Sequence, residues 1–309
     1  MILSNCAYLV FDISNLLYRT FFAQRDETDD VIAGLATHSA LVTLNKYYRM
    51  FKPTHGVVMA FDRTSWRKQY TASEECISKK PYKGNRRKDM SPSQKLKYER
   101  FLKHIDEFEN LIAEHTTIIS LAYEPLEADD LIAGFCQFHS SEDTPVIVIS
   151  ADSDLLQLVR NPGVTVVSPV TDKPQTLSEY FNDPDYYLFM KCVRGDPTDN
   201  IQSAYPRVYA TRIRKAYTDP FERVQLMKET WTGPGGVEYV VEDLFKENQK
   251  LIDLEKQPDD IRDLIEAVVT VAMNKKRQFS MFHLLRFIGK YKLDRIKESL
   301  DQYIPLLSS

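Results

Sequence analysis

The first half of the chain alternates short apolar runs with segments of helical periodicity. Residues 7–12 (AYLVFD), 56–62 (GVVMAFD) and 144–152 (TPVIVISAD) are apolar runs that end in aspartate. Helical periodicity follows the first run, from about residue 31 to 51, and precedes the third, from about residue 129 to 138. Val/Ile runs that alternate with helices predict an α/β fold, with a central, mostly parallel sheet flanked by helices on both faces.

The rest of the chain has a different pattern. Residues 63–103 lack strand periodicity and form a long insertion after the second apolar run. Residues 161–174 (NPGVTVVSPVTDKP) predict a further strand between turns, and beyond about residue 180 the pattern is mainly helical. We therefore expect a larger domain at 1–180 and a smaller, mainly helical domain at 181–309.

Acidic residues follow the predicted strands. Ligands of parallel sheets bind beyond the carboxyl ends of the strands, and each of the three apolar runs ends in aspartate. Further acids occur in short groups at the start of a predicted helix, after the third run and in a glycine-containing turn. The candidates are Asp12, Asp62, Glu127, Asp129, Asp130, Asp152, Asp154, Asp196 and Asp199. We expect them to converge at one edge of the sheet.

Each of these acids taken alone has an ordinary explanation, because an aspartate after a strand often caps the next helix. A cap needs one oxygen, however, and these groups contain two or three carboxylates. Like charges gathered at one edge shift toward the neutral form unless cations are present. Carboxylates without Cys or His favour Mg²⁺ or Mn²⁺ over zinc, and two such ions about 4 Å apart promote in-line displacement at phosphorus. The pattern indicates phosphodiester hydrolysis.

Charge and composition bear on the binding partner and the location of the protein. The formal net charge is −4, yet residues 63–103 contain thirteen Lys or Arg and four Asp or Glu. Such a run is usually a solvated loop, but this one lies between candidate catalytic acids and includes aromatic residues that can stack on unpaired bases. The four cysteines are widely separated, and no apolar run approaches the length of a membrane span. We expect reduced thiols and a cytoplasmic protein.

The order and the sequences of these motifs resemble those of the 5′-nuclease (flap endonuclease) superfamily. The matching segments are VFDISNLLYR, FDRTSWR, YKGNR, LEADDLIA, ISADSDLLQL and RGDPTDNI, between about residues 8 and 201. Within the superfamily the chain is most similar to the stand-alone 5′-nucleases (ribonuclease H) of T-even-like bacteriophages, so a phage origin and the host cytoplasm are expected. The resemblance implies 5′→3′ exonuclease and flap endonuclease activity, with removal of RNA primers in replication.

The resemblance also implies roles for individual residues. It implies one Mg²⁺ among Asp12, Asp62, Glu127, Asp129 and Asp152, and a second near Asp154, Asp196 and Asp199, while Asp130 matches the last acid of the family's E-A-D-D form. The basic insertion would be a helical arch over the 5′ strand, in which Lys83 and Arg86 reach the scissile phosphate. Nucleic-acid contacts are further predicted for Arg67, Tyr82, Arg87, Lys88, Arg207, Arg212, Arg214 and Lys215.

Two features leave alternatives open. In most of the family a glycine-rich helix–two-turn–helix element follows the GDPTDN turn and holds duplex phosphates, often with a potassium ion. Residues 201–210 lack those glycines, which puts monovalent-ion binding in doubt. The basic residues between 207 and 215 are either phosphate contacts or an exposed helix face.

The nuclease hypothesis has competitors and implies partners. A catalytically silent, structure-specific DNA-binding protein on the same fold is the main alternative, and a PIN-type ribonuclease would lack the long insertion. The expected partners are DNA and RNA/DNA duplexes with 5′ flaps, nicks or ends, together with a single-strand-binding protein or other replication proteins. We expect a monomer.

Overall fold

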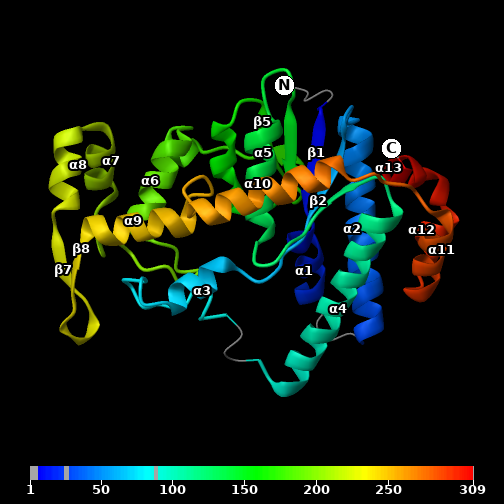
Figure 1. The fold of residues 1–309 in the computed structure, drawn as a ribbon, viewed down its shortest axis with the longest axis horizontal. Helices are drawn as coiled ribbons and strands as arrows, with labels where there is room; N and C mark the ends of the chain where they lie inside the picture. Colours follow the sequence, from blue (N-terminus) through cyan, green and yellow to red (C-terminus); the bar gives the residue numbers. More distant parts are fainter. Residues whose placement is uncertain (1–5, 24–27, 87–89, 309) are drawn as a thin grey trace.

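The computed structural model describes residues 6–23, 28–86 and 90–308, and its centre is a sheet (Figure 1). The strands are β1 (Tyr8–Asp12), β2 (Gly56–Ala60), β3 (Ile119–Leu121), β4 (Val146–Ile149), β5 (Val164–Ser168) and β6 (Lys173–Pro174). Within the described residues they form one six-stranded sheet in the order β3-β2-β1-β4-β5-β6. All neighbours pair in parallel except β5 and β6. The predicted mostly parallel α/β sheet is confirmed.

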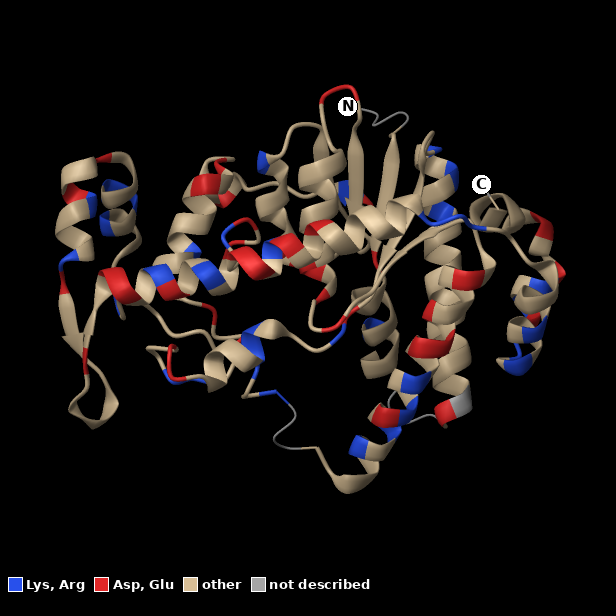
Figure 2. Ribbon diagram, in the orientation of Figure 1, with Lys and Arg blue, Asp and Glu red and all other residues tan. Residues whose placement is uncertain are grey.

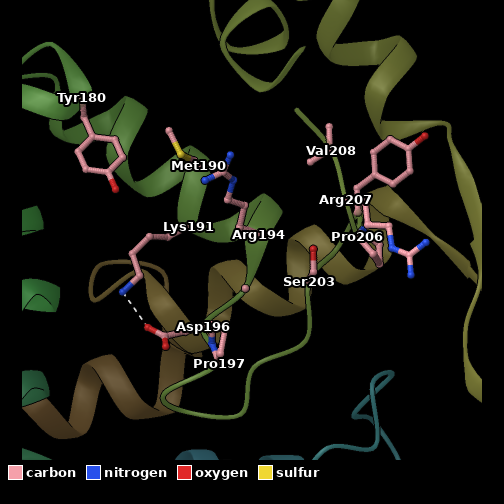
Figure 3. A pocket seen from close by; sticks show the side chains of 12 residues that line it. Tyr180, Met190, Lys191, Arg194, Asp196, Pro197, Ser203, Pro206, Arg207 and Val208 are labelled. Atoms are coloured by element: carbon pink, nitrogen blue, oxygen red, sulfur yellow. Dashed lines mark ion pairs between the residues drawn. The ribbon is translucent and has the colours of Figure 1, made fainter. Parts of the chain in front are cut away.

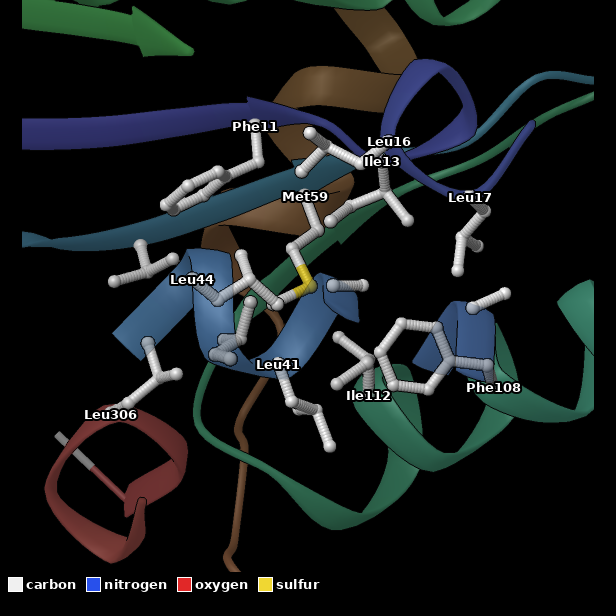
Figure 4. Close-up of a cluster of buried hydrophobic side chains, with 14 of the residues drawn as sticks. Phe11, Ile13, Leu16, Leu17, Leu41, Leu44, Met59, Phe108, Ile112 and Leu306 are labelled. Carbon is white, nitrogen blue, oxygen red and sulfur yellow. The ribbon is translucent and has the colours of Figure 1, made fainter. Parts of the chain in front are cut away.

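Helices cover both faces of this sheet. Successive strand residues point to opposite faces, so Leu9 and Phe11 of β1 join one buried cluster and Val10 joins another. The first cluster (Figure 4) lies against α1 (Ile13–Ala23), α2 (Asp29–Phe51), α4 (Pro92–His115), α11 (Met281–Lys290), α12 (Asp294–Glu298) and α13 (Ile304–Ser308). The second lies against α5 (Ala128–His139), η1 (Ser153–Arg160) and α10 (Asp259–Asn274).

Element boundaries agree with the sequence pattern where the pattern is long. The helices predicted at 31–51 and 129–138 are α2 and α5, with ends that differ by one or two residues. Strand β3 is not predicted, because its three residues are too few for a period to be recognised. None of the helices in the described ranges has both the length and the apolar character needed to cross a membrane.

The basic insertion is only partly helical. It contains α3 (Trp66–Ala72), an irregular stretch that the structure describes as far as Arg86, and the beginning of α4. Helix α4 starts with a capping box, in which Ser91 and Gln94 exchange hydrogen bonds. From Tyr98 onward α4 contributes buried side chains to the first cluster. The predicted extent to residue 103 is therefore too long, because the last residues of that range belong to the core.

A second lobe extends from one side of the sheet domain (Figure 1). It consists of α6 (Pro184–Arg194), α7 (Ala210–Thr218), α8 (Pro220–Met227), the hairpin β7 (Thr230–Thr232) and β8 (Glu238–Val240), and α9 (Val241–Ile252). The chain then returns, because α10 packs on α5 while α11 and α13 contact α4 and α2. The division predicted at residue 180 therefore does not match the packing, since residues from Leu254 to Leu307 contribute to the two clusters of the sheet domain.

Candidate functional site

The carboxyl ends of β1, β2 and β4 bring together acids that are far apart in sequence. Asp12 is the last residue of β1, and it pairs with Ala60 at the end of β2, two residues before Asp62. Asp152 follows β4 and caps η1, where its Oδ1 accepts a hydrogen bond from the backbone N of Asp154. Figure 2 shows acidic segments at this edge and Lys and Arg on α3 and the N-terminal half of α4. The expected convergence of these acids depends on parallel strands ending at one edge.

Asp12 is buried and carries two hydrogen bonds. Its Oδ1 accepts one from the backbone N of Asn15 at 3.0 Å, and its Oδ2 accepts one from the hydroxyl of Ser150 at 2.9 Å. Burial, together with the nearby charges of Asp62 and Asp152, outweighs these hydrogen bonds and raises the pKa of Asp12 to about 7. A nearby cation would stabilise the ionised form of a carboxyl group in this position.

Asp62 and Asp129 lie close to Asp12, Glu127 and Asp152, and these five residues form the first acidic group. Oδ1 of Asp62 accepts a hydrogen bond from the backbone N of Ala128, 2.9 Å away, at the first turn of α5. Burial and then the charge of Glu127 raise the pKa of Asp62. Burial also raises the pKa of Asp129 well above its usual range, and the neighbouring aspartates, led by Asp152, act in the same direction.

Glu127 is held in its charged form by two cations. The Nζ of Lys83 lies 2.6 Å from Oε1 of Glu127, and a guanidinium nitrogen of Arg67 lies 3.2 Å from Oε2. The hydroxyl of Ser65 donates to Oε2 at 2.7 Å. Burial opposes the ionisation of Glu127, but the charges of Lys83 and Arg67 outweigh it and lower the pKa of Glu127 to about 2. Lys83 therefore lies directly beside the acidic group.

Arg67 and Asp130 form a buried pair. Two guanidinium nitrogens of Arg67 donate to Asp130, at 3.0 and 2.8 Å, and its Nε donates to the backbone O of Leu251 at 2.8 Å. Asp130 also accepts a hydrogen bond from the side-chain amide of Gln257. Arg67 is 2% exposed and Asp130 is 0% exposed. Asp130 as a metal ligand and Arg67 as a phosphate contact do not fit this geometry, because both side chains point into the protein and already have several partners.

A second acidic group surrounds Lys191, which the sequence analysis does not single out. Its Nζ lies 3.0 Å from Oδ2 of Asp196 (Figure 3) and also forms an ion pair with Asp154. Burial raises the pKa of Asp154 in spite of Lys191. Burial also opposes the ionisation of Asp196, but Lys191 and the hydrogen bonds of Thr198 lower the pKa of Asp196. The available signal is a single lysine within the otherwise apolar run YYLFMKCV of α6.

Asp199 connects the GDPTDN turn to the basic insertion. Its Oδ2 accepts a hydrogen bond from the hydroxyl of Tyr82 at 2.7 Å, and its Oδ1 lies 2.5 Å from the guanidinium of Arg86. The Nζ of Lys83 is 3.8 Å from Oδ2 of Asp199. The ring of Tyr82 is buried among apolar side chains of α6 and α9. The predicted contact of Tyr82 with nucleic acid does not fit, because neither its ring nor its hydroxyl is available.

Backbone contacts fix the stretch that carries Lys83 and Arg86. The backbone N of Lys83 donates to the backbone O of Asp199 at 2.8 Å. The side-chain amide of Asn85 donates to the backbone O of Pro197 at 2.9 Å. The two predicted catalytic cations are thus held by the turn that follows α6.

The other predicted nucleic-acid contacts lie around α7. Arg207 is exposed before this helix. Arg212 pairs with Glu229 at 2.5 Å and Lys215 with Glu222 at 2.5 Å, while Arg214 lies 4.0 Å from the ring centroid of Phe181. Arg87 and Lys88 fall outside the described residues. These contacts stay predictions.

A pocket of about 640 Å³ opens beside Lys191 and Asp196 (Figure 3). Arg194, Ser203 and Arg207 are among its lining residues. The pocket therefore joins the second acidic group to the turn that precedes α7.

The acids do not form a ready-made metal cage. As the described side chains lie, no three Asp, Glu, His or Cys residues converge tightly enough to hold one ion. Their donor atoms are hard oxygens, and Mg²⁺ usually keeps several waters while binding one or two carboxylates. The acidic groups therefore fit such an ion, with a few carboxylate oxygens as ligands and water molecules as the remaining ones.

Known sequences match the first two thirds of the chain. A family model described as the 5′-3′ exonuclease, N-terminal resolvase-like domain matches residues 7–183. The chain is 31% identical to the DNA polymerase I of Mycobacterium leprae over 204 residues, which are 62% of this chain and 20% of the polymerase. It is 29% identical to the DNA polymerase I of Caldicellulosiruptor bescii over 207 residues, 62% of this chain and 22% of that polymerase. The chain thus spans about a fifth of the length of these relatives.

Solved structures share the fold at low sequence identity. The D15 protein of T5, crystallised with metal ions, matches with a TM-score of 0.62 and 17% identity, covering 86% of this chain and 99% of that protein. The bacteriophage T5 D15 flap endonuclease in a complex with DNA and metal ions matches with a TM-score of 0.61 and 17% identity, covering 87% and 99%. This likeness establishes the common fold.

Proposed function

Because the chain belongs to the 5′→3′ exonuclease family, we propose that it is a metal-dependent nuclease that cuts phosphodiester bonds at 5′ ends and 5′ flaps of nicked or branched duplexes. The observation that carries this proposal is that acidic groups gather at the carboxyl edge of the sheet beside two cations, Lys83 paired with Glu127 and Arg86 paired with Asp199. A protein that only binds DNA gains nothing from concentrated negative charge facing phosphate.

Two Mg²⁺ ions are the proposed cofactors, with Mn²⁺ as a substitute. The first would lie among the acids at the ends of β1, β2 and β4 and the start of α5, and the second beside Asp154 and Asp196. Bound ions of this kind activate water and stabilise the leaving oxygen of an in-line displacement. The raised pKa values of Asp12 and Asp129 support the proposal, because such carboxyl groups ionise more readily next to a cation.

Lys83 and Arg86 are the proposed phosphate-binding residues. Both are held close to the acids by their contacts with Glu127 and Asp199. A phosphodiester gathers negative charge on its non-bridging oxygens in the transition state, so a fixed ammonium and a fixed guanidinium lower the barrier. A bound phosphate would share these cations with the carboxylates.

The proposed substrates are DNA and RNA/DNA duplexes. The similar D15 flap endonuclease was solved with DNA and metal ions. The basic residues before and along α7 would add phosphate contacts that position a duplex without reading its sequence. Removal of RNA primers during replication, alongside other replication proteins, is the proposed role.

A cleavage assay on a 5′-labelled flap duplex tests the proposal. We expect products with Mg²⁺ and none with EDTA. Asp152→Asn should cleave about 100-fold more slowly or worse, because it removes one acid of the first group. Asp143→Asn is the matched control, since Asp143 is exposed before the amino end of β4, away from the acidic edge, and it should cleave like the wild type.

The product lengths separate the activities. Single-nucleotide products indicate exonuclease activity, and flap-length products indicate endonuclease activity. Tight binding of the duplex without any cleavage would support the silent DNA-binding protein instead. Normal cleavage by Asp152→Asn would refute the metal assignment.

A further inference from the structure

Residues 251–257 comprise the end of α9 in the second lobe and the linker toward α10, and most of them are buried. Leu251, Ile252 and Leu254 are buried. Buried backbone groups need hydrogen-bond partners, and three side chains of the sheet domain bind this backbone. They are Arg67 on α3, Gln137 on α5 and Gln157 on η1. Arg67 and Gln157 each also contact one of the acidic groups.

Arg67 makes the connection to the first group. Its Nε binds the backbone O of Leu251, and its remaining guanidinium nitrogens bind Glu127 and Asp130. Gln257, at the other end of the segment, donates to Oδ1 of Asp130 at 2.8 Å. Oδ2 of Asp130 in turn accepts a hydrogen bond from the backbone N of Glu127 at 3.1 Å. Both the side chain and the backbone of Glu127 are therefore held by this network.

Gln157 makes the connection to the second group. Its side-chain N donates to the backbone O of Asp154 at 2.8 Å and to that of Ile252 at 3.1 Å. Its side-chain O accepts a hydrogen bond from the backbone N of Leu254 at 2.9 Å. Asp154 lies in the first turn of η1, a 3₁₀-helix, whose own hydrogen bonds have poorer geometry than those of an α-helix. The side chain of Gln157 supplies an additional hydrogen bond to the backbone O of Asp154 in this turn.

An ion pair strengthens the attachment at the far end of η1. Arg160 lies 2.5 Å from Oδ1 of Asp253, in the middle of the segment. The 3₁₀-helix that presents Asp154 is thus tied to the segment by two of its side chains, Gln157 and Arg160.

We propose that residues 251–257 act through Arg67 and Gln157 as a positioning segment, which sets the orientation of Glu127 and Asp154 and couples the second lobe to the catalytic edge. The inference rests on the proposed nuclease function. Arg67 and Gln157 are positioning residues, because both are buried and reach a substrate or an ion only through another side chain. Removing a residue that orients a metal ligand typically lowers metal affinity or activity about 10–100-fold.

The test replaces Gln157 and compares it with a glutamine that contacts the same segment. Gln157→Met keeps the length of the side chain and removes its three hydrogen bonds. Gln137→Met is the matched control, because the amide of Gln137 donates to the backbone O of Leu254 at 3.3 Å and contacts no acid of the site. Calorimetry measures Mn²⁺ binding, and cleavage of the flap duplex gives kcat and KM. Urea unfolding measures the stability of each variant.

We expect Gln157→Met to bind Mn²⁺ about 10-fold more weakly or worse and to lose kcat to a similar degree, with KM nearly unchanged. Gln137→Met should lose some stability but stay within about 3-fold of the wild type in both properties. Gln257→Met, which removes a partner of Asp130 instead, should weaken Mn²⁺ binding in the same direction. It keeps the test decisive where Gln157→Met does not fold.

The outcomes separate this inference from the proposed function. A wild type that binds Mn²⁺ and cleaves, with Gln157→Met and Gln257→Met indistinguishable from Gln137→Met, overturns the positioning role alone. A wild type that neither binds Mn²⁺ nor cleaves overturns the nuclease function, and the positioning role with it.

Discussion

The Nζ of Lys191 lies 3.0 Å from Oδ2 of Asp196 and also pairs with Asp154, so one ammonium group joins acids from two different elements. The lysine side chain is 15% exposed, which limits screening by solvent. Lys191 therefore supplies the charge that keeps the second acidic group together, next to the position proposed for the second ion.

Replacing Lys191 by methionine leaves Asp154 and Asp196 facing each other without a counter-charge. Without divalent ions, we expect the free energy of unfolding to fall by about 2 kcal/mol. We also expect Mn²⁺ to stabilise the variant more than the wild type, since the ion replaces the missing charge. Urea unfolding with and without Mn²⁺ measures both effects. Lys246→Met, which breaks an exposed pair with Glu242, is the control and should leave the free energy of unfolding close to that of the wild type. Equal stabilisation of wild type and Lys191→Met by Mn²⁺ would contradict the prediction.

Asp130→Asn separates a structural acid from a metal ligand. We expect a loss of about 3 kcal/mol in the free energy of unfolding, because Arg67 is left buried without its full counter-charge. Mn²⁺ affinity should fall less than in Asp129→Asn, whose carboxyl group lies among the acids of the first group. Denaturant unfolding and calorimetry of the two variants provide the measurement. A greater loss of Mn²⁺ binding in Asp130→Asn would restore Asp130 as a ligand.

Lys83→Ala should slow chemistry more than it weakens binding. The ammonium lies 2.6 Å from Glu127, at the acidic edge, where it stabilises charge that develops in the transition state. We expect kcat to fall about 100-fold, with less than about a 10-fold change in the Kd for the flap duplex. Lys79→Ala is the control, because Lys79 is exposed in the same insertion and contacts backbone oxygens there. Equal losses in kcat and binding would reduce Lys83 to a general phosphate contact.

His104 makes stability depend on pH. It is buried, its Nε2 lies 2.7 Å from the hydroxyl of Thr37, and burial lowers the pKa of His104 from 6.5 to about 4. The unfolded chain therefore binds a proton between these pH values and the folded protein does not. The contribution of His104 to stability should be complete above about pH 6.5 and decline by about 3 kcal/mol as the pH falls toward 4, while the raised pKa values of Asp12 and Asp129 act in the opposite direction over the same interval.

Urea unfolding between pH 4 and 7 checks this prediction. The stability of the wild type relative to His104→Gln should fall as the pH decreases over that interval. His55→Gln, at an exposed position, should keep the slope of the wild-type profile. A difference in stability between wild type and His104→Gln that stays constant between pH 4 and 6.5 would show that His104 does not titrate as expected.

The sequence by itself determined the sheet and the place where its acids meet. Val/Ile runs and helical periodicity are local properties, and they identify β1, β2, β4, α2 and α5. The direction of a parallel strand then places the residue that follows it. For this reason Asp12, Asp62 and Asp152 could be assigned to one edge without coordinates.

Only the tertiary structure decided which polar groups at that edge face one another. Asp129 and Asp130 are neighbours in the sequence, yet α5 directs Asp130 into the interior against Arg67, while Asp129 lies among the acids. Lys191 and Gln157 gain their significance from contacts with elements distant along the chain. Local patterns record how often a residue type recurs, but the partner of a buried charge depends on how separate elements pack, and that is fixed only when the chain has folded.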